Sequence, residues 1–64
     1  MEIQRVIIKK INSGRVIFEE EFSDYDNAYD KALKVANSGF KVLILTQFNN
    51  GKWSKSFLNP PDNY

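Results

Sequence analysis

The 64-residue chain contains no cysteine and no histidine. It therefore lacks a thiol nucleophile, the commonest general base, a disulfide and the usual ligands of structural zinc. A domain of this size must then be stabilised by packing alone. Its five Phe, three Tyr and one Trp supply large apolar side chains for that purpose. The absence of thiols also suits a reducing compartment.

Long apolar runs are missing as well. The longest is Val42–Leu45, whereas a membrane-spanning helix needs roughly 20 predominantly apolar residues. Met1 leads directly into a strand-like segment, without a basic and then apolar leader. From these features we expect a cytoplasmic protein that is not embedded in a membrane.

Motifs that bind phosphates or metals are also absent from the sequence. Its three glycines are isolated and form neither G-x-x-x-x-G-K-[ST] nor G-x-G-x-x-G. Asp24, Asp26 and Asp30 are close in sequence, but they lack the glycine and terminal glutamate of a calcium loop. The sequence therefore predicts no enzyme activity, no cofactor and no metal site.

A helix is predicted over residues 24–37, because apolar and polar side chains occupy opposite arcs at about 100° per residue. Ser23 suits the N-cap position, and Gly39 suits the left-handed residue that follows a helix. Ala32 lies near the centre of the apolar arc. That arc comprises Tyr25, Ala28, Tyr29, Ala32, Leu33, Val35 and Ala36.

Two hairpins flank the helix. Residues 2–11 and 15–22 are rich in β-branched and aliphatic residues, and Asn12-Ser13-Gly14 separates them. The register of this first hairpin stays open between a two-residue and a three-residue loop, because either loop places charged side chains among the apolar ones. Residues 40–48 and 53–58 form the second hairpin. Its Asn50-Gly51 pair predicts a type I′ turn with positive φ at both residues.

The resulting order, β-β-α-β-β, predicts an α+β fold in residues 1–58, followed by a Pro-containing tail at 59–64. We expect a four-stranded antiparallel sheet with the helix on one face. In element order and length the chain resembles a β-grasp domain of the immunoglobulin-binding protein G type, although no motif is shared. That resemblance implies strand order 2-1-4-3. We favour 2-1-3-4, because the third strand is far more apolar than the fourth.

The faces of the second hairpin follow from its turn. A type I′ turn places Phe48 opposite Trp53 and Ile44 opposite Phe57. We expect the helix to cover this aromatic face, because its alanines leave room for large rings. The uncovered face would then display Leu43, Leu45 and Leu58, an aliphatic patch suited to protein binding or self-association. With the faces reversed, Trp53 and Phe57 beside Lys55 would form a stacking platform for single-stranded nucleic acid.

The net charge of +1 is unevenly distributed. Residues 1–18 carry four bases and one acid (+3), residues 19–30 six acids (−6), and residues 31–64 five bases and one acid (+4). The acidic segment, with Glu19 and Glu21, is either a solvated strand edge or a patch that engages a basic protein surface.

We therefore predict a small non-catalytic module that binds a protein partner and modulates it, as inhibitors encoded by phages or mobile elements do with host enzymes. One alternative is a nucleic-acid-binding protein that uses a basic and aromatic sheet face, although its near-zero net charge argues against this. The other alternative is a structural homo-oligomer in which the subunits are joined through an edge strand. The candidate partner-binding residues are Leu43, Leu45, Leu58, Glu19, Glu21, Trp53 and Lys55.

Overall fold

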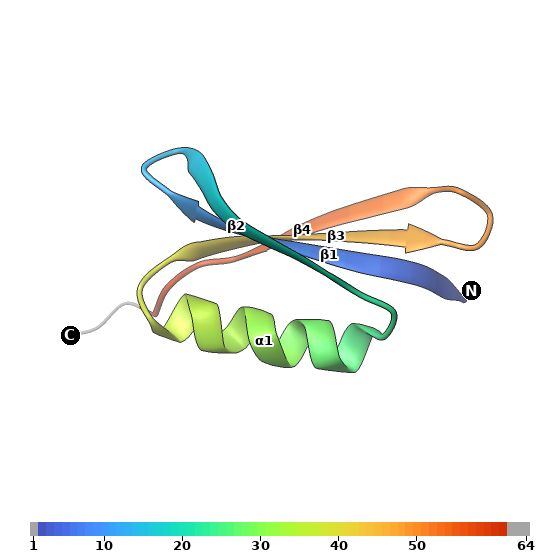
Figure 1. Cartoon of the computed structure of the whole chain (residues 1–64), viewed down its shortest axis with the longest axis horizontal. Coiled ribbons are helices and arrows are strands. Elements are labelled where there is room, and N and C mark those ends of the chain that lie inside the picture. The colour runs from blue at the N-terminus through green and yellow to red at the C-terminus, as the bar shows by residue number, and fades with distance from the viewer. Residues whose placement is uncertain (1, 62–64) are drawn as a thin grey trace.

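A four-stranded antiparallel sheet carries one helix on one of its faces (Figure 1). The computed structural model describes residues 2–61, so residues 62–64 of the predicted tail lie outside the described part. The strand order is β2-β1-β3-β4. This confirms the predicted α+β arrangement and order, and the β-grasp order is wrong. The elements are β1 (Ile3–Asn12), β2 (Arg15–Phe22), α1 (Tyr25–Asn37), β3 (Lys41–Phe48) and β4 (Trp53–Leu58).

The helix begins at Tyr25, one residue later than predicted. Asp24, rather than Ser23, is the N-cap, and its carboxylate accepts a hydrogen bond from the Asn27 backbone N–H at 3.2 Å. The predicted cap at Ser23 is therefore wrong; aspartate caps a helix as well as serine does. At the other end Gly39 has the predicted left-handed conformation, with φ of 101°. Its N–H donates to the Ala36 carbonyl at 3.0 Å.

The core lies between α1 and the two central strands. Ala28, Ala32 and Ala36 of the helix are at most 3% exposed. Their small side chains allow the helix to lie close to the sheet, where aliphatic residues of β1 and β3 complete the packing. Those buried aliphatic residues are Val6, Ile8, Val42 and Ile44. The space under the helix is therefore filled by β-branched side chains, and not by the rings of Trp53 and Phe57 as expected.

The first hairpin combines a tight turn with a bulge. Ser13 and Gly14 have φ of 53° and 80°, and the strands pair as Asn12 with Arg15 on either side of them. Two residues with positive φ are typical of a type I′ turn. Beyond the turn, the pairing shifts between residues 10 and 11, which leaves Ile17 as an extra residue in β2. After the extra residue, the side chains of β2 alternate between the two faces in the opposite order. No single register could therefore separate the apolar from the charged side chains.

The second hairpin has a longer loop than predicted. Gly51 has φ of 87°, but Asn50 is not among the described residues with positive φ. The Gly51 N–H donates to the Phe48 carbonyl, and the Phe48 N–H donates to the Lys52 carbonyl, each at 2.9 Å. These bonds close a three-residue loop that ends in a left-handed glycine. The predicted type I′ turn is therefore wrong.

The longer loop shifts β4 by one residue against β3. Trp53 lies opposite Gln47 and Phe57 opposite Leu43, so the predicted pairs of Phe48 with Trp53 and of Ile44 with Phe57 are wrong. Because successive side chains alternate between the faces of a sheet, a one-residue shift moves every β4 side chain to the other face. Trp53, Lys55 and Phe57 consequently point away from the helix.

The left-handed conformation of Gly51 can be tested by substitution. A Cβ at this position would meet no atom within 4 Å, so any cost arises from the backbone. We expect Gly51→Val to lower the free energy of unfolding by about 1–2 kcal/mol. Gly51→Asn should cost clearly less, because asparagine tolerates this region. Urea unfolding of the two variants checks this, and equal losses would contradict the loop conformation.

Candidate interaction site on the uncovered sheet face

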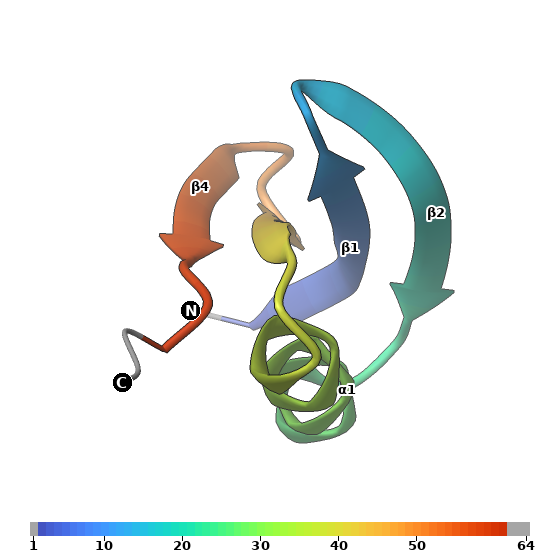
Figure 2. The ribbon, with the colours of Figure 1, turned by 90° about the vertical axis from the view of Figure 1, so that its left-hand side faces the viewer.

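The sheet face opposite α1 is uncovered by any described element (Figure 2). We call it the open face. Since Val6, Ile8, Val42 and Ile44 point to the helix, the alternating residues of each strand and their cross-strand partners point to the open face. These are Arg5, Ile7, Lys9 and Ile11 of β1; Val16, Glu19 and Glu21 of β2; Lys41, Leu43, Leu45 and Gln47 of β3; and Trp53, Lys55 and Phe57 of β4.

Aliphatic side chains occupy the middle of the open face. Ile7 of β1 lies opposite Leu45 of β3, and Leu43 lies two residues before Leu45 on the same strand, so that it points to the same face. All three are partly buried by their neighbours within the sheet. No described element lies over them, so they form an apolar centre that water contacts.

Two aromatic residues border this centre on β4. Trp53 and Phe57 are each 47% exposed, and β4 is an edge strand of the sheet that residues 2–61 form. Lys55 lies between them in the chain and points to the same face. Aromatic side chains this exposed at one sheet edge are typical of a binding surface rather than of a core.

A cation lies close to each exposed ring. The Arg5 guanidinium carbon is 5.7 Å from the centroid of the Trp53 ring. Lys41 Nζ is 4.5 Å from the centroid of the Phe57 ring. Such contacts stabilise by about 0.5–1 kcal/mol at exposed sites. They restrict where the rings lie, and they occupy part of the ring faces.

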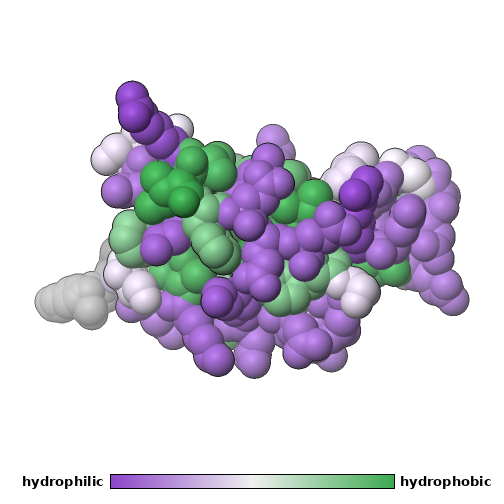
Figure 3. Space-filling view, viewed as in Figure 1, coloured by the Kyte–Doolittle hydropathy of each residue, from purple (hydrophilic) through white to green (hydrophobic). Residues whose placement is uncertain are grey.

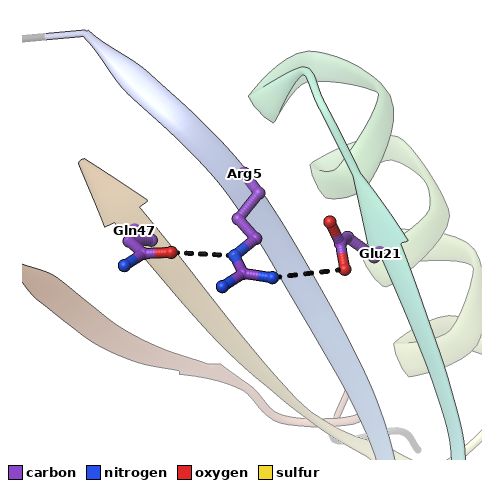
Figure 4. Close-up of polar contacts among 3 residues, drawn as sticks. All are labelled: Arg5, Glu21 and Gln47. Carbon is purple, nitrogen blue, oxygen red and sulfur yellow. Dashed lines mark hydrogen bonds and ion pairs between the residues drawn. The ribbon is translucent and has the colours of Figure 1, made fainter. Parts of the chain in front are cut away.

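Arg5 joins three strands on the open face (Figure 4). Its Nε donates to Gln47 Oε1 at 2.8 Å, and its Nη1 lies 3.7 Å from Glu21 Oε1. The two ion-pair partners are 41% and 58% exposed, and an exposed pair contributes little to stability, at most about 1 kcal/mol. The network therefore orients side chains at the surface more than it holds the fold.

Charges on the open face are separated by strand. The acidic residues Glu19 and Glu21 lie on β2, at one edge of the sheet. The basic residues Arg5, Lys9, Lys41 and Lys55 lie on the other three strands. Within residues 2–61, the side chains of Lys55 and Glu19 make no hydrogen bond or ion pair. The acidic side chains thus lie at the β2 edge, and the basic side chains are spread over the rest of the face.

All the candidate residues from the sequence except Leu58 lie on the open face. Leu58 pairs with Val42 and packs against the core from the helix side. Its expected place in an uncovered aliphatic patch is wrong, because that place rested on the type I′ register. Ile7 and Arg5 also belong to the open face but were not predicted, because their place depends on the register of β1. Phe57 lies on the same face as Trp53 and Lys55, as expected for the reversed faces.

A second group of exposed apolar side chains lies at the β1–β2 hairpin. Val16, Ile17 and Phe18 are 51%, 49% and 39% exposed. Figure 3 shows hydrophobic surface close to this hairpin, and a largely hydrophilic surface along the outer side of α1. Val16 extends the apolar centre toward the acidic edge, beside Ile11, its partner in the sheet.

Other kinds of site are not found in residues 2–61. No group of three or more His, Cys, Asp or Glu side chains is placed to hold a metal ion, and these residues enclose no pocket. Within the same range no helix has the length and apolar character needed to cross a membrane. Comparison with protein-family models, with curated proteins and with solved structures finds no match for this chain.

Proposed function

We propose that this protein is a non-catalytic interaction module that binds a protein partner through the open face. One observation supports this most strongly: an aliphatic centre, two exposed aromatic residues and a charged border occur together on a face that no described element covers. Protein interfaces have the same composition, with an apolar centre enriched in Trp, Tyr, Phe and Arg and a polar rim.

Single-stranded nucleic acid is the second candidate, because Trp53 and Phe57 lie beside Lys55 on the basic part of the open face. Bases stack on accessible ring faces, and their phosphates require a continuous positive groove. Here Arg5 and Lys41 already lie over the rings. The middle of the face is aliphatic, and its β2 edge would repel phosphates. These features favour a protein partner.

Such a module acts by covering a surface on its partner. It suits the role of an inhibitor or modulator, as with phage or mobile-element proteins directed at host enzymes. A chain without cysteine is compatible with action in the reducing cytoplasm. These finer points of origin, mode of action and location are part of the proposal.

Three variants of exposed aromatic residues test the site. Trp53→Ala and Phe57→Ala remove rings from the open face, whereas Tyr29→Ala removes a ring that is 37% exposed on the helix. All three should remain folded by circular dichroism. In capture from a lysate of the source organism, we expect the bound proteins to persist with Tyr29→Ala and to disappear with the other two. Apolar burial predicts this at about 50 and at 500 mM salt alike.

Two outcomes would contradict the proposal. If Trp53→Ala and Phe57→Ala retain the same bound proteins as the unchanged chain, the open face is not the binding surface. The second outcome uses a fluorescent single-stranded oligonucleotide of about 12 nucleotides. Micromolar binding that weakens steeply with salt and is lost in Trp53→Ala would assign the face to nucleic acid, since counterion release makes such binding salt-dependent.

A further inference from the structure

One cross-strand row of the open face is complementary to itself. Lys55 of β4 pairs with Leu45 of β3, Leu45 with Ile7 of β1, and Ile7 with Glu21 of β2. The row thus reads basic, aliphatic, aliphatic, acidic from one edge of the sheet to the other. If the same row of a second copy lies over it in the reverse direction, opposite charges face each other and aliphatic side chains face each other.

Homodimers are mostly related by a two-fold axis, and sheets that pack face to face in the aligned arrangement keep their strands within about 30° of each other. Two such axes are available to the open face. An axis across the strands lays β4 on β4 and β2 on β2, which opposes like charges. An axis along the strands lays β4 of one copy on β2 of the other. Only the second orientation opposes Lys55 to Glu21 of the second copy.

The surroundings of Lys55 and Glu21 suit this contact. Trp53 and Phe57 lie on either side of Lys55 and would exclude water from the edge of the interface, which strengthens an ion pair. Lys55 has no ion-pair partner among residues 2–61, and Glu21 has only the long contact to Arg5. Both groups are therefore available to a second molecule.

From this complementarity we propose that a second copy of the chain packs on the open face, about a two-fold axis parallel to the strands. Lys55 of each copy pairs with Glu21 of the other, and Leu45 packs on Ile7 of the other. This inference rests on the proposed function, and it names the partner as the chain itself.

Charge reversal at these two positions tests the proposal. Lys55→Glu and Glu21→Lys alter exposed side chains, so both variants should fold. Sedimentation at about 100 mM salt and at roughly 5–500 µM protein should show a dimer for the unchanged chain. Each variant alone should dimerise at least about tenfold more weakly, because it opposes two pairs of like charges. Their equimolar mixture should dimerise as the unchanged chain does, since both pairs are again of opposite sign.

Glu21→Gln is the matched control, because it removes the contact to Arg5 without reversing the charge. It should weaken the dimer less than Glu21→Lys. A chain that stays monomeric at 500 µM would overturn the inference. So would a dimer that both charge reversals leave unchanged, since another surface or the other axis would then be in use. A mixture no stronger than its components would overturn it too.

The proposed function fails under different results. A monomeric chain that still captures a protein in a Trp53-dependent manner overturns the second copy as partner, but it supports a protein-binding open face. A charge-dependent dimer supports both proposals. A monomeric chain whose capture is indifferent to Trp53 overturns both.

Discussion

Ala32→Lys is expected to remove a large part of the stability of the protein. Ala32 is fully buried at the middle of the helix face that packs on the sheet. A lysine there must overpack a close helix–sheet contact and bring a charge into it. We expect a loss of about 3 kcal/mol or more, against a total stability of about 3–10 kcal/mol for a domain of this length.

Asn27→Lys provides the matched control for that prediction. Asn27 belongs to the same helix and its side chain is exposed. Its backbone N–H donates the cap bond to the Asp24 carboxylate, and the substitution leaves that bond in place. Its cost should be less than about 0.5 kcal/mol. Thermal unfolding followed by far-ultraviolet circular dichroism compares the two, and equal midpoints would show that the buried face of α1 is misassigned.

The helix and the strand order could be predicted because buried side chains produce regular apolar patterns in the sequence. Alanines at positions 28, 32 and 36 mark one face of a helix. The apolar run in β3, compared with the serines and lysine of β4, separates a central strand from an edge strand. These signals depend on the sum over many side chains. The prediction therefore remains correct when one position is misjudged, as when the N-cap is placed at Ser23 instead of Asp24.

The register of the second hairpin could not be predicted in this way. Asn-Gly fits a two-residue turn, and it equally fits the end of a three-residue loop in which only the glycine is left-handed. The two loops differ by one residue, but they place opposite sets of β4 side chains toward the helix. Hydrophobic alternation does not decide between them, because one set holds Trp53 and Phe57 and the other holds Leu58. The structure selects the second loop.

Long-range contacts contribute to that selection. The Asn49 backbone N–H donates to the Glu2 carbonyl at 2.9 Å, and the Asn49 side chain donates to Glu2 Oε1 at 2.9 Å. The Asn50 side chain accepts from the Lys52 N–H at 3.0 Å. The bonds to Glu2 join residues 47 positions apart, and no local pattern reveals them. The composition of the open face therefore depends on contacts that the sequence does not display.

A second large loss of stability is expected for Ile8→Ala. Ile8 is 1% exposed, and it lies opposite Ile44 in β3. The three buried residues of the helix are alanines, and their side chains are too short to fill the space that a truncated Ile8 leaves. Truncation of a core residue loses the transfer free energy of the removed atoms, and the cavity that remains adds a further cost. We therefore expect the free energy of unfolding to fall by about 2–5 kcal/mol.

Ile17→Ala removes the same atoms from a different environment. Ile17 is 49% exposed and is the extra residue at the β2 bulge, so its truncation should cost less than about 1 kcal/mol. Urea unfolding of both variants at about 5 µM, where self-association contributes least, measures the difference. Similar losses would mean that the β2 edge is packed as tightly as the space under the helix. In that case the separation between a buried helix face and an accessible open face, on which both proposals depend, would not hold.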